Sequence, residues 1–124
     1  KRLPLLHHAS DIEPLSLLPE MARIATDMVV DILRAFVERD AEAAVRVCER
    51  DQAVDDFYDS IFRTLLTHMM ENPHNIGQSA HLLFVAKNLE RVGDHATNIA
   101  EMVYYAATGD HMIEPQKKRR RKPV

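Results

Sequence analysis

Apolar residues recur at helical spacing along three long segments, and this periodicity most limits what the chain can fold into. Between 15 and 38 they form a stripe of Leu18, Met21, Ala25, Met28, Ile32, Ala35 and Phe36. Between 41 and 70 the stripe comprises Val47, Val54, Tyr58, Ile61, Leu65 and Met69. Between 74 and 107 it comprises Leu82, Val85, Leu89, Val92, Ala96, Ile99 and Val103. Each stripe predicts an amphipathic helix that buries one face.

Residues that start and stop helices divide these segments. Asp40 is a suitable N-cap for the second helix, and Asn72 followed by Pro73 is typical of the start of the third. Pro19 fits the first turn of the first helix or a late start, and Gly109 fits a C-cap. No stretch alternates with a period of two, so no strand is predicted. Short turns between three long helices predict an all-α, antiparallel three-helix bundle over 15–110.

Length and composition agree with one small helical domain. The chain has 124 residues, enough for a single core, and it contains no Trp and only three Gly. No apolar run reaches the roughly 18 residues that a membrane span requires. The start of the sequence has no signal-peptide pattern, so a cytoplasmic protein is expected. The single Cys48 cannot form an internal disulfide, which fits a reducing compartment.

Both ends of the sequence differ from the middle. The segment 1–14 is interrupted by prolines and is interpreted as a linker from a preceding bundle that this sequence lacks. The segment 111–124 contains KKRRRK at 117–122 and is expected to be a disordered basic tail. The net charge is nevertheless −3, so the body of the chain is clearly acidic. Basic tails are most often solvated and less often contact nucleic acid, lipid or an acidic partner; no nucleic-acid partner is expected here.

Carboxylates recur four residues apart on two of the predicted helices. Asp51, Asp55 and Asp59 form one such row, and Glu90 and Asp94 form another. Side chains at this spacing project from consecutive helical turns, about 6 Å apart, so like charges repel and a cation between them would relieve the repulsion. At 100° per residue the second row lies almost opposite the apolar stripe of 74–107. Asp51 and Asp55 instead flank the apolar stripe of 41–70 and could face the edge of a neighbouring helix. The two rows are expected to face outward on the same side of the bundle.

A simpler interpretation of these rows is a solvated helix face. Lys87 and Arg91 are close enough in sequence to balance the acidic residues. No nucleophile motif, phosphate-binding loop or zinc-ligand spacing is present, so an enzyme is not expected, and a metal-dependent phosphohydrolase is the weakest alternative. Gly93 lies near the apolar stripe and indicates a close approach between helices.

The stretch LERVGDHATNIAE at 89–101 resembles the signature of the PhoU family of phosphate-signalling regulators. The likeness extends over nearly the whole chain, which is similar to the C-terminal of the two three-helix bundles in that family. The resemblance implies a multinuclear metal cluster of iron, or of manganese, magnesium or zinc, held by paired acidic motifs. Carried over by motif, the ligands are Asp51, Asp55, Glu90 and Asp94. Secondary ligand candidates are Asp59, Asn98 and Glu101.

The resemblance also implies a function. Members of this family are negative regulators of the phosphate-starvation response, and they link a phosphate ABC transporter to a sensor histidine kinase. These partners would bring a cytoplasmic protein to the inner membrane, and a homodimer is a further expectation. The alternative is a metal-free helical interaction domain whose acidic face docks a basic partner.

Overall fold

Three long helices form the part of the chain that the computed structural model describes, residues 14–112. They are α2 (Pro14–Glu38), α3 (Ala41–Glu71) and α4 (Ile76–Thr108), and a short 3₁₀ turn, η1 (Pro73–Asn75), precedes α4. These bounds agree almost residue for residue with the predicted helices. The predicted linker over 1–14 and the predicted tail over 111–124 fall almost entirely outside the described residues.

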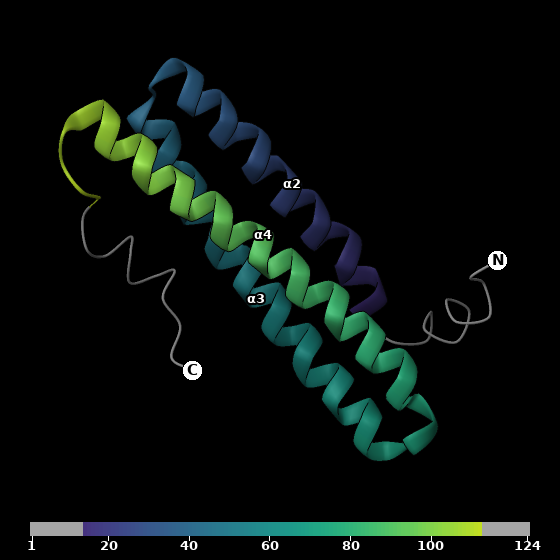
Figure 1. Cartoon of the computed structure of the whole chain (residues 1–124). Coiled ribbons are helices and arrows are strands. Elements are labelled where there is room, and N and C mark those ends of the chain that lie inside the picture. Colours follow the sequence, from purple (N-terminus) through teal and green to yellow (C-terminus); the bar gives the residue numbers. More distant parts are fainter. Residues whose placement is uncertain (1–13, 113–124) are drawn as a thin grey trace.

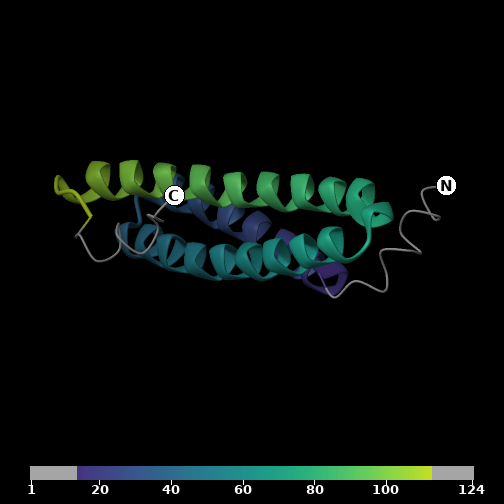
Figure 2. The same cartoon turned by 90° about the horizontal axis from the view of Figure 1, so that it is seen from below.

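The helices lie side by side as an antiparallel bundle (Figures 1 and 2). The chain runs along α2, reverses into α3 and reverses again into α4, and each helix packs against the other two. No strand occurs within residues 14–112. The predicted all-α three-helix bundle is therefore confirmed.

Local side-chain chemistry explains where the helices end. The Asp40 carboxylate accepts a hydrogen bond from the Ala43 N–H at 3.1 Å, as an N-cap should. Gly109 takes a left-handed conformation with φ of 80°, and its N–H donates to the Tyr105 carbonyl at 2.7 Å. Asn72 caps η1 rather than α4, accepting from the His74 N–H at 3.0 Å. The 3₁₀ turn delays the start of the third long helix to Ile76.

Pro19 lies inside α2 rather than in its first turn, because the helix already begins at Pro14. Pro14 can occupy a first-turn position without cost, since N–H groups there have no helical partner. Pro19 lacks the N–H that would bond back within the helix, and the helix continues through it. Pro19 therefore marks neither a first turn nor a late start, whereas the predicted start of the helix near residue 15 is confirmed.

Most of the predicted core is confirmed in α2 and α3. The buried side chains of α2 are Leu18, Met21, Ala25, Met28, Ile32 and Ala35, and those of α3 include Val47, Val54, Ile61 and Leu65. Phe36 is a wrong prediction, because its side chain is 64% exposed. Ala35 takes the core position at that turn, and Phe36, one residue later, is rotated by about 100° toward solvent.

Small residues line the buried face of α4. Ser79, Ala86, Gly93 and Ala100 recur every seven residues and are all buried. The bulkier Val85, Leu89, Val92 and Ile99 are only half-buried and lie at the margins of the core. The centre of the buried face is therefore rotated by roughly 80° from the stripe that hydrophobicity predicts. Small side chains allow α4 to approach its neighbours closely, and the rotation carries Glu90 inward.

Candidate cation site between α3 and α4

Three contacts establish how α3 and α4 are aligned. The Lys87 ammonium lies 5.3 Å from the centre of the Tyr58 ring, and Gly93 faces Asp51 and Val54. The Cys48 thiol lies 3.9 Å from the Thr97 carbonyl, a long contact for a weak S–H donor. Because the helices are antiparallel, each step forward along α4 matches one step back along α3. Glu90 therefore lies level with Asp55, and Asp94 lies level with Asp51.

The acidic side chains at this level are buried. Asp51 is 0% exposed, Asp55 is 1% exposed and Glu90 is 8% exposed. The prediction of two rows on the outside of the bundle is thus wrong for these three residues. For Glu90, the prediction assumed that the bulkiest side chains of α4 mark the centre of its buried face. The small residues of α4 mark that centre instead. The carboxylates consequently lie within the α3–α4 interface.

Gly93 creates the space that the Asp51 carboxylate occupies. A Cβ atom on Gly93 would lie 2.8 Å from Asp51 Oδ1, closer than carbon and oxygen can pack, and 3.5 Å from Val54 Cγ1. The oxygen thus lies directly against the backbone of α4. This confirms the close helix approach expected at Gly93. It also shows that the glycine accommodates a charged group as well as a helix crossing.

Glu90 is held at the margin of the same interface by a lysine. Lys87 Nζ lies 3.0 Å from Glu90 Oε1, and the ammonium also lies over the Tyr58 ring. The hydrogen bond to Glu90 raises the pKa of Lys87 above its ordinary value. Because a raised lysine pKa favours the charged form in the folded state, the pair contributes at neutral pH. Its contribution is lost only as pH rises through the raised pKa.

The remaining candidate ligands lie farther from the core. Asp59, Asp94 and Glu101 are half-buried, and Asn98 is exposed. Asn98 and Glu101 line an open pocket of about 380 Å³, where the Tyr105 and His111 rings stack. Glu101 is eleven residues beyond Glu90, about 16 Å along the helix axis. The structure therefore does not bring Glu101 close enough to Glu90 for the two to share one ion.

The donor atoms fit a hard cation, although they do not form a closed ligand set. Carboxylate oxygens are the ligands that Fe³⁺, Mn²⁺, Mg²⁺ and Ca²⁺ prefer. Within residues 14–112, no three His, Cys, Asp or Glu side chains converge in an arrangement that would hold a metal ion. Two buried carboxylates one helical turn apart supply part of a coordination shell, and Glu90 lies level with them in contact with Lys87.

The row of small residues on α4 that packs against α3 and buries these carboxylates was not predicted from the sequence. Ser79, Ala86, Gly93 and Ala100 are spaced by seven, which is the repeat of a helix–helix contact. That spacing was visible in the sequence and, given weight equal to the bulky stripe, would have placed Glu90 near the interface. Thr97, one turn beyond Gly93, is fully buried on the same side of α4.

Comparison with known proteins agrees with this architecture. The PhoU domain family matches residues 18–103, which include most of each of the three helices and every predicted primary ligand. None of the helices described between 14 and 112 combines the length and apolar character needed to cross a membrane.

Relatives carry the same family name. The chain is 51% identical over 114 residues to the phosphate-specific transport system accessory protein PhoU homolog of Zymomonas mobilis, covering 92% of this chain and 48% of the relative. It is 49% identical over 102 residues to the homolog of the same name in Rhizobium meliloti, covering 82% of this chain and 42% of the relative. A Caulobacter vibrioides homolog is 42% identical over 119 residues, or 95% of this chain and 52% of the relative. The chain thus spans about half the length of these curated relatives, and it belongs to the PhoU family.

Proposed function

We propose that this chain is a regulatory module of phosphate uptake. In this role it would act as a negative regulator of the phosphate-starvation response, linking a phosphate ABC transporter to a sensor histidine kinase. The family match over 18–103 and the relatives named as phosphate-transport accessory proteins support this proposal. The module would act without catalysis, in the cytoplasm next to the inner membrane, where its partners reside.

The burial of acidic residues at the α3–α4 interface carries the proposal that the module binds a cation. Burying a charged carboxylate costs free energy that an opposite charge must offset. Asp51 and Asp55 are almost completely buried and lie one turn apart on the same helix. A hard cation bound between α3 and α4 would take oxygen ligands from Asp51, Asp55, Glu90 and Asp94, and its positive charge would favour their ionised forms. When bound, it would supply positive charge that fixes the two helices against each other.

Lys87 has a defined part in this proposal. In the structure, Lys87 Nζ lies 3.0 Å from Glu90 Oε1 and holds this carboxylate at the margin of the interface. A bound cation would compete with the ammonium for the Glu90 carboxylate. Lys87 is half exposed and can turn toward solvent at little cost. The lysine would thus neutralise Glu90 in the absence of the cation and release it on binding.

The affinity for Mn²⁺ tests this assignment. Glu90→Gln is expected to weaken Mn²⁺ binding by about tenfold or more, because a charged ligand is replaced by a neutral one of equal size. Asp56→Asn is the charge control, since Asp56 is exposed on α3, outside the proposed ligand set, and accepts a hydrogen bond from Gln52. Calorimetric titration of the three proteins gives the affinities. Equal affinities in all three would reject Glu90 as a ligand.

A metal-free interaction domain is the second candidate, and one observation favours it. No three acidic, His or Cys side chains converge on one point within residues 14–112. In this account the half-buried Asp94 and Glu101 form part of an acidic edge that attracts a basic partner. Such attraction depends on salt, because charges at a surface are screened within about 10 Å at 0.1 M.

Binding to the purified cytoplasmic portion of a sensor kinase distinguishes the two candidates. A cation-dependent module should lose most of its binding to the kinase in the presence of a chelator, because α3 and α4 lose the cation that they share. A metal-free acidic edge should bind equally with or without chelator and weaken several-fold toward about 0.3 M salt. Glu71→Gln, at the exposed end of α3, serves as a charge control. Absence of binding to both the kinase and the transporter ATPase would contradict the regulatory proposal itself.

A further inference from the structure

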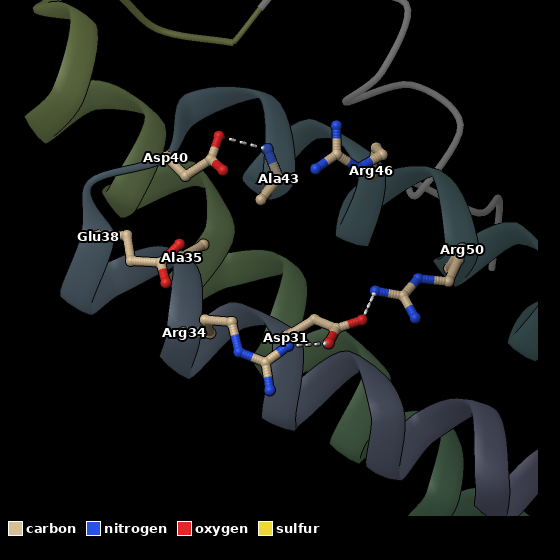
Figure 3. Close-up of a pocket in the computed structure, with 8 residues that line it drawn as sticks. All are labelled: Asp31, Arg34, Ala35, Glu38, Asp40, Ala43, Arg46 and Arg50. Atoms are coloured by element: carbon tan, nitrogen blue, oxygen red, sulfur yellow. Dashed lines mark hydrogen bonds and ion pairs between the residues drawn. The ribbon is translucent and has the colours of Figure 1, made fainter.

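A second polar site lies where α2 ends and α3 begins. It is a pocket of about 210 Å³ between the last turns of α2 and the first turns of α3. Figure 3 shows Arg34 on α2 and both Arg46 and Arg50 on α3 around the same opening. The α3–α4 interface does not contribute to it. This pocket has no part in the function proposed above.

The carboxylates of the pocket already have partners. Asp31 forms ion pairs with Arg50, across from α2 to α3, and with Arg34 at 3.6 Å on its own helix. Asp40 accepts the capping hydrogen bond from the Ala43 N–H. Asp31 and Asp40 are the two half-buried acids of the pocket, and both are engaged by these interactions. Glu38 also lines the pocket and is exposed.

Donor groups in the pocket exceed what these acids use. Each guanidinium carries five N–H donors, and Asp31 engages only part of those on Arg34 and Arg50. Arg46 makes no ion pair or hydrogen bond among residues 14–112, and its guanidinium borders the opening in Figure 3. The capped N-terminus of α3 places the positive end of one helix dipole at the pocket, and the last turn of α2 places the negative end of another there. The pocket is therefore rich in donors on three sides.

We propose that this pocket binds a small tetrahedral oxyanion, with inorganic phosphate as the representative ligand. A tetrahedral anion offers oxygens in several directions, so guanidinium groups from three positions can each reach a different oxygen. A planar carboxylate matches a single guanidinium fork and uses the arrangement less well. The volume also lies below the 300–1,000 Å³ typical of sites for drug-sized ligands. The ligand is thus a small ion.

Asp31 lowers the affinity of this pocket for an anion. It competes with the incoming anion for Arg34 and Arg50, and Glu38 and Asp40 add further negative charge nearby. Three acids and three arginines leave the lining neutral overall. Binding therefore depends on the local arrangement of donors rather than on long-range attraction, and the affinity is weak, on the order of millimolar.

Titration of the whole chain with potassium phosphate, at ionic strength held constant with chloride, tests the site. Arginine Nε–Hε chemical shifts report where the ion binds. Arg46→Gln is expected to weaken binding about tenfold, and its fold should be intact because Arg46 is exposed and makes no ion pair or hydrogen bond among residues 14–112. Asp31→Asn is expected to tighten binding several-fold by removing the internal competitor. Arg63→Gln, an exposed arginine farther along α3, should change nothing.

Several results would overturn the proposal. The proposal is wrong if phosphate acts no differently from chloride, if acetate binds as tightly as phosphate, or if Asp31→Asn weakens the affinity. Equal losses in Arg46→Gln and Arg63→Gln would show a general charge effect rather than a site. Because none of these variants alters Asp51, Asp55 or Glu90, a failure here is distinguishable from a failure of the cation site.

Discussion

Replacing Asp51 and Asp55 together by asparagine is expected to abolish the stabilisation of the fold by Mn²⁺ or Fe³⁺. The same change should raise the free energy of unfolding of the cation-free chain, by about 1–3 kcal/mol. Both carboxylates are almost completely buried and lie one turn apart, so desolvation and their mutual repulsion both disfavour the charged forms in the folded state. Asparagine keeps the shape and removes the charge. The two effects have opposite signs, which makes the variant diagnostic.

Urea unfolding with and without Mn²⁺ measures both effects. For the unchanged chain, a cation at a hundred times its dissociation constant should add about 2.7 kcal/mol of stability. Asp56→Asn should retain that gain, because Asp56 is exposed on the same helix. A double variant that is less stable than the unchanged chain in chelator, yet still responds to Mn²⁺, would contradict the assignment of these residues.

Gly93→Leu is expected to destabilise the chain by about 1–3 kcal/mol, by forcing α3 and α4 apart. A Cβ atom at this position already lies 2.8 Å from Asp51 Oδ1, and a longer side chain meets Val54 as well. No nearby space can take up the added volume, since α4 packs here through small buried residues. Thermal or urea unfolding gives the loss directly.

Gly93→Ala distinguishes the effect of this position on stability from its effect on the cation site. Alanine favours a helix over glycine by about 1 kcal/mol, which offsets part of the clash, so stability should change little. The Asp51 carboxylate must move, and Mn²⁺ affinity should fall about tenfold. Gly77→Ala is the control: no atom lies within 4 Å of its Cβ position, so it should be neutral or stabilising and leave the affinity unchanged. Identical behaviour of the two alanine variants would refute the role given to Gly93.

The helices themselves could be predicted from sequence because their signals are local. Asp40 and Gly109 act on the backbone within a few residues, and both caps are as predicted. The apolar stripes of α2 and α3 were also reliable, since their largest side chains are the ones that meet in the core. Phe36 was misplaced because an exposed aromatic at a helix end looks the same in sequence as a buried one.

The environment of the site could not be predicted in the same way. Motif resemblance identified Asp51, Asp55 and Glu90 as candidates, but hydrophobicity placed Glu90 on the outside. Glycine, alanine and serine contribute little to a hydrophobic stripe, although at a close helix contact they mark its centre. The alignment of α3 with α4 and the contact between Gly93 and Asp51 depend on residues far apart in sequence. Only the folded chain establishes them.

An anomalous difference map from crystals grown with Mn²⁺ tests the central claim most directly. The account predicts a peak between α3 and α4, within about 2.0–2.6 Å of carboxylate oxygens from Asp51, Asp55 and Glu90, with Lys87 turned away from Glu90. No peak at saturating Mn²⁺, or a peak bound only by exposed carboxylates elsewhere while Lys87 still contacts Glu90, would contradict it.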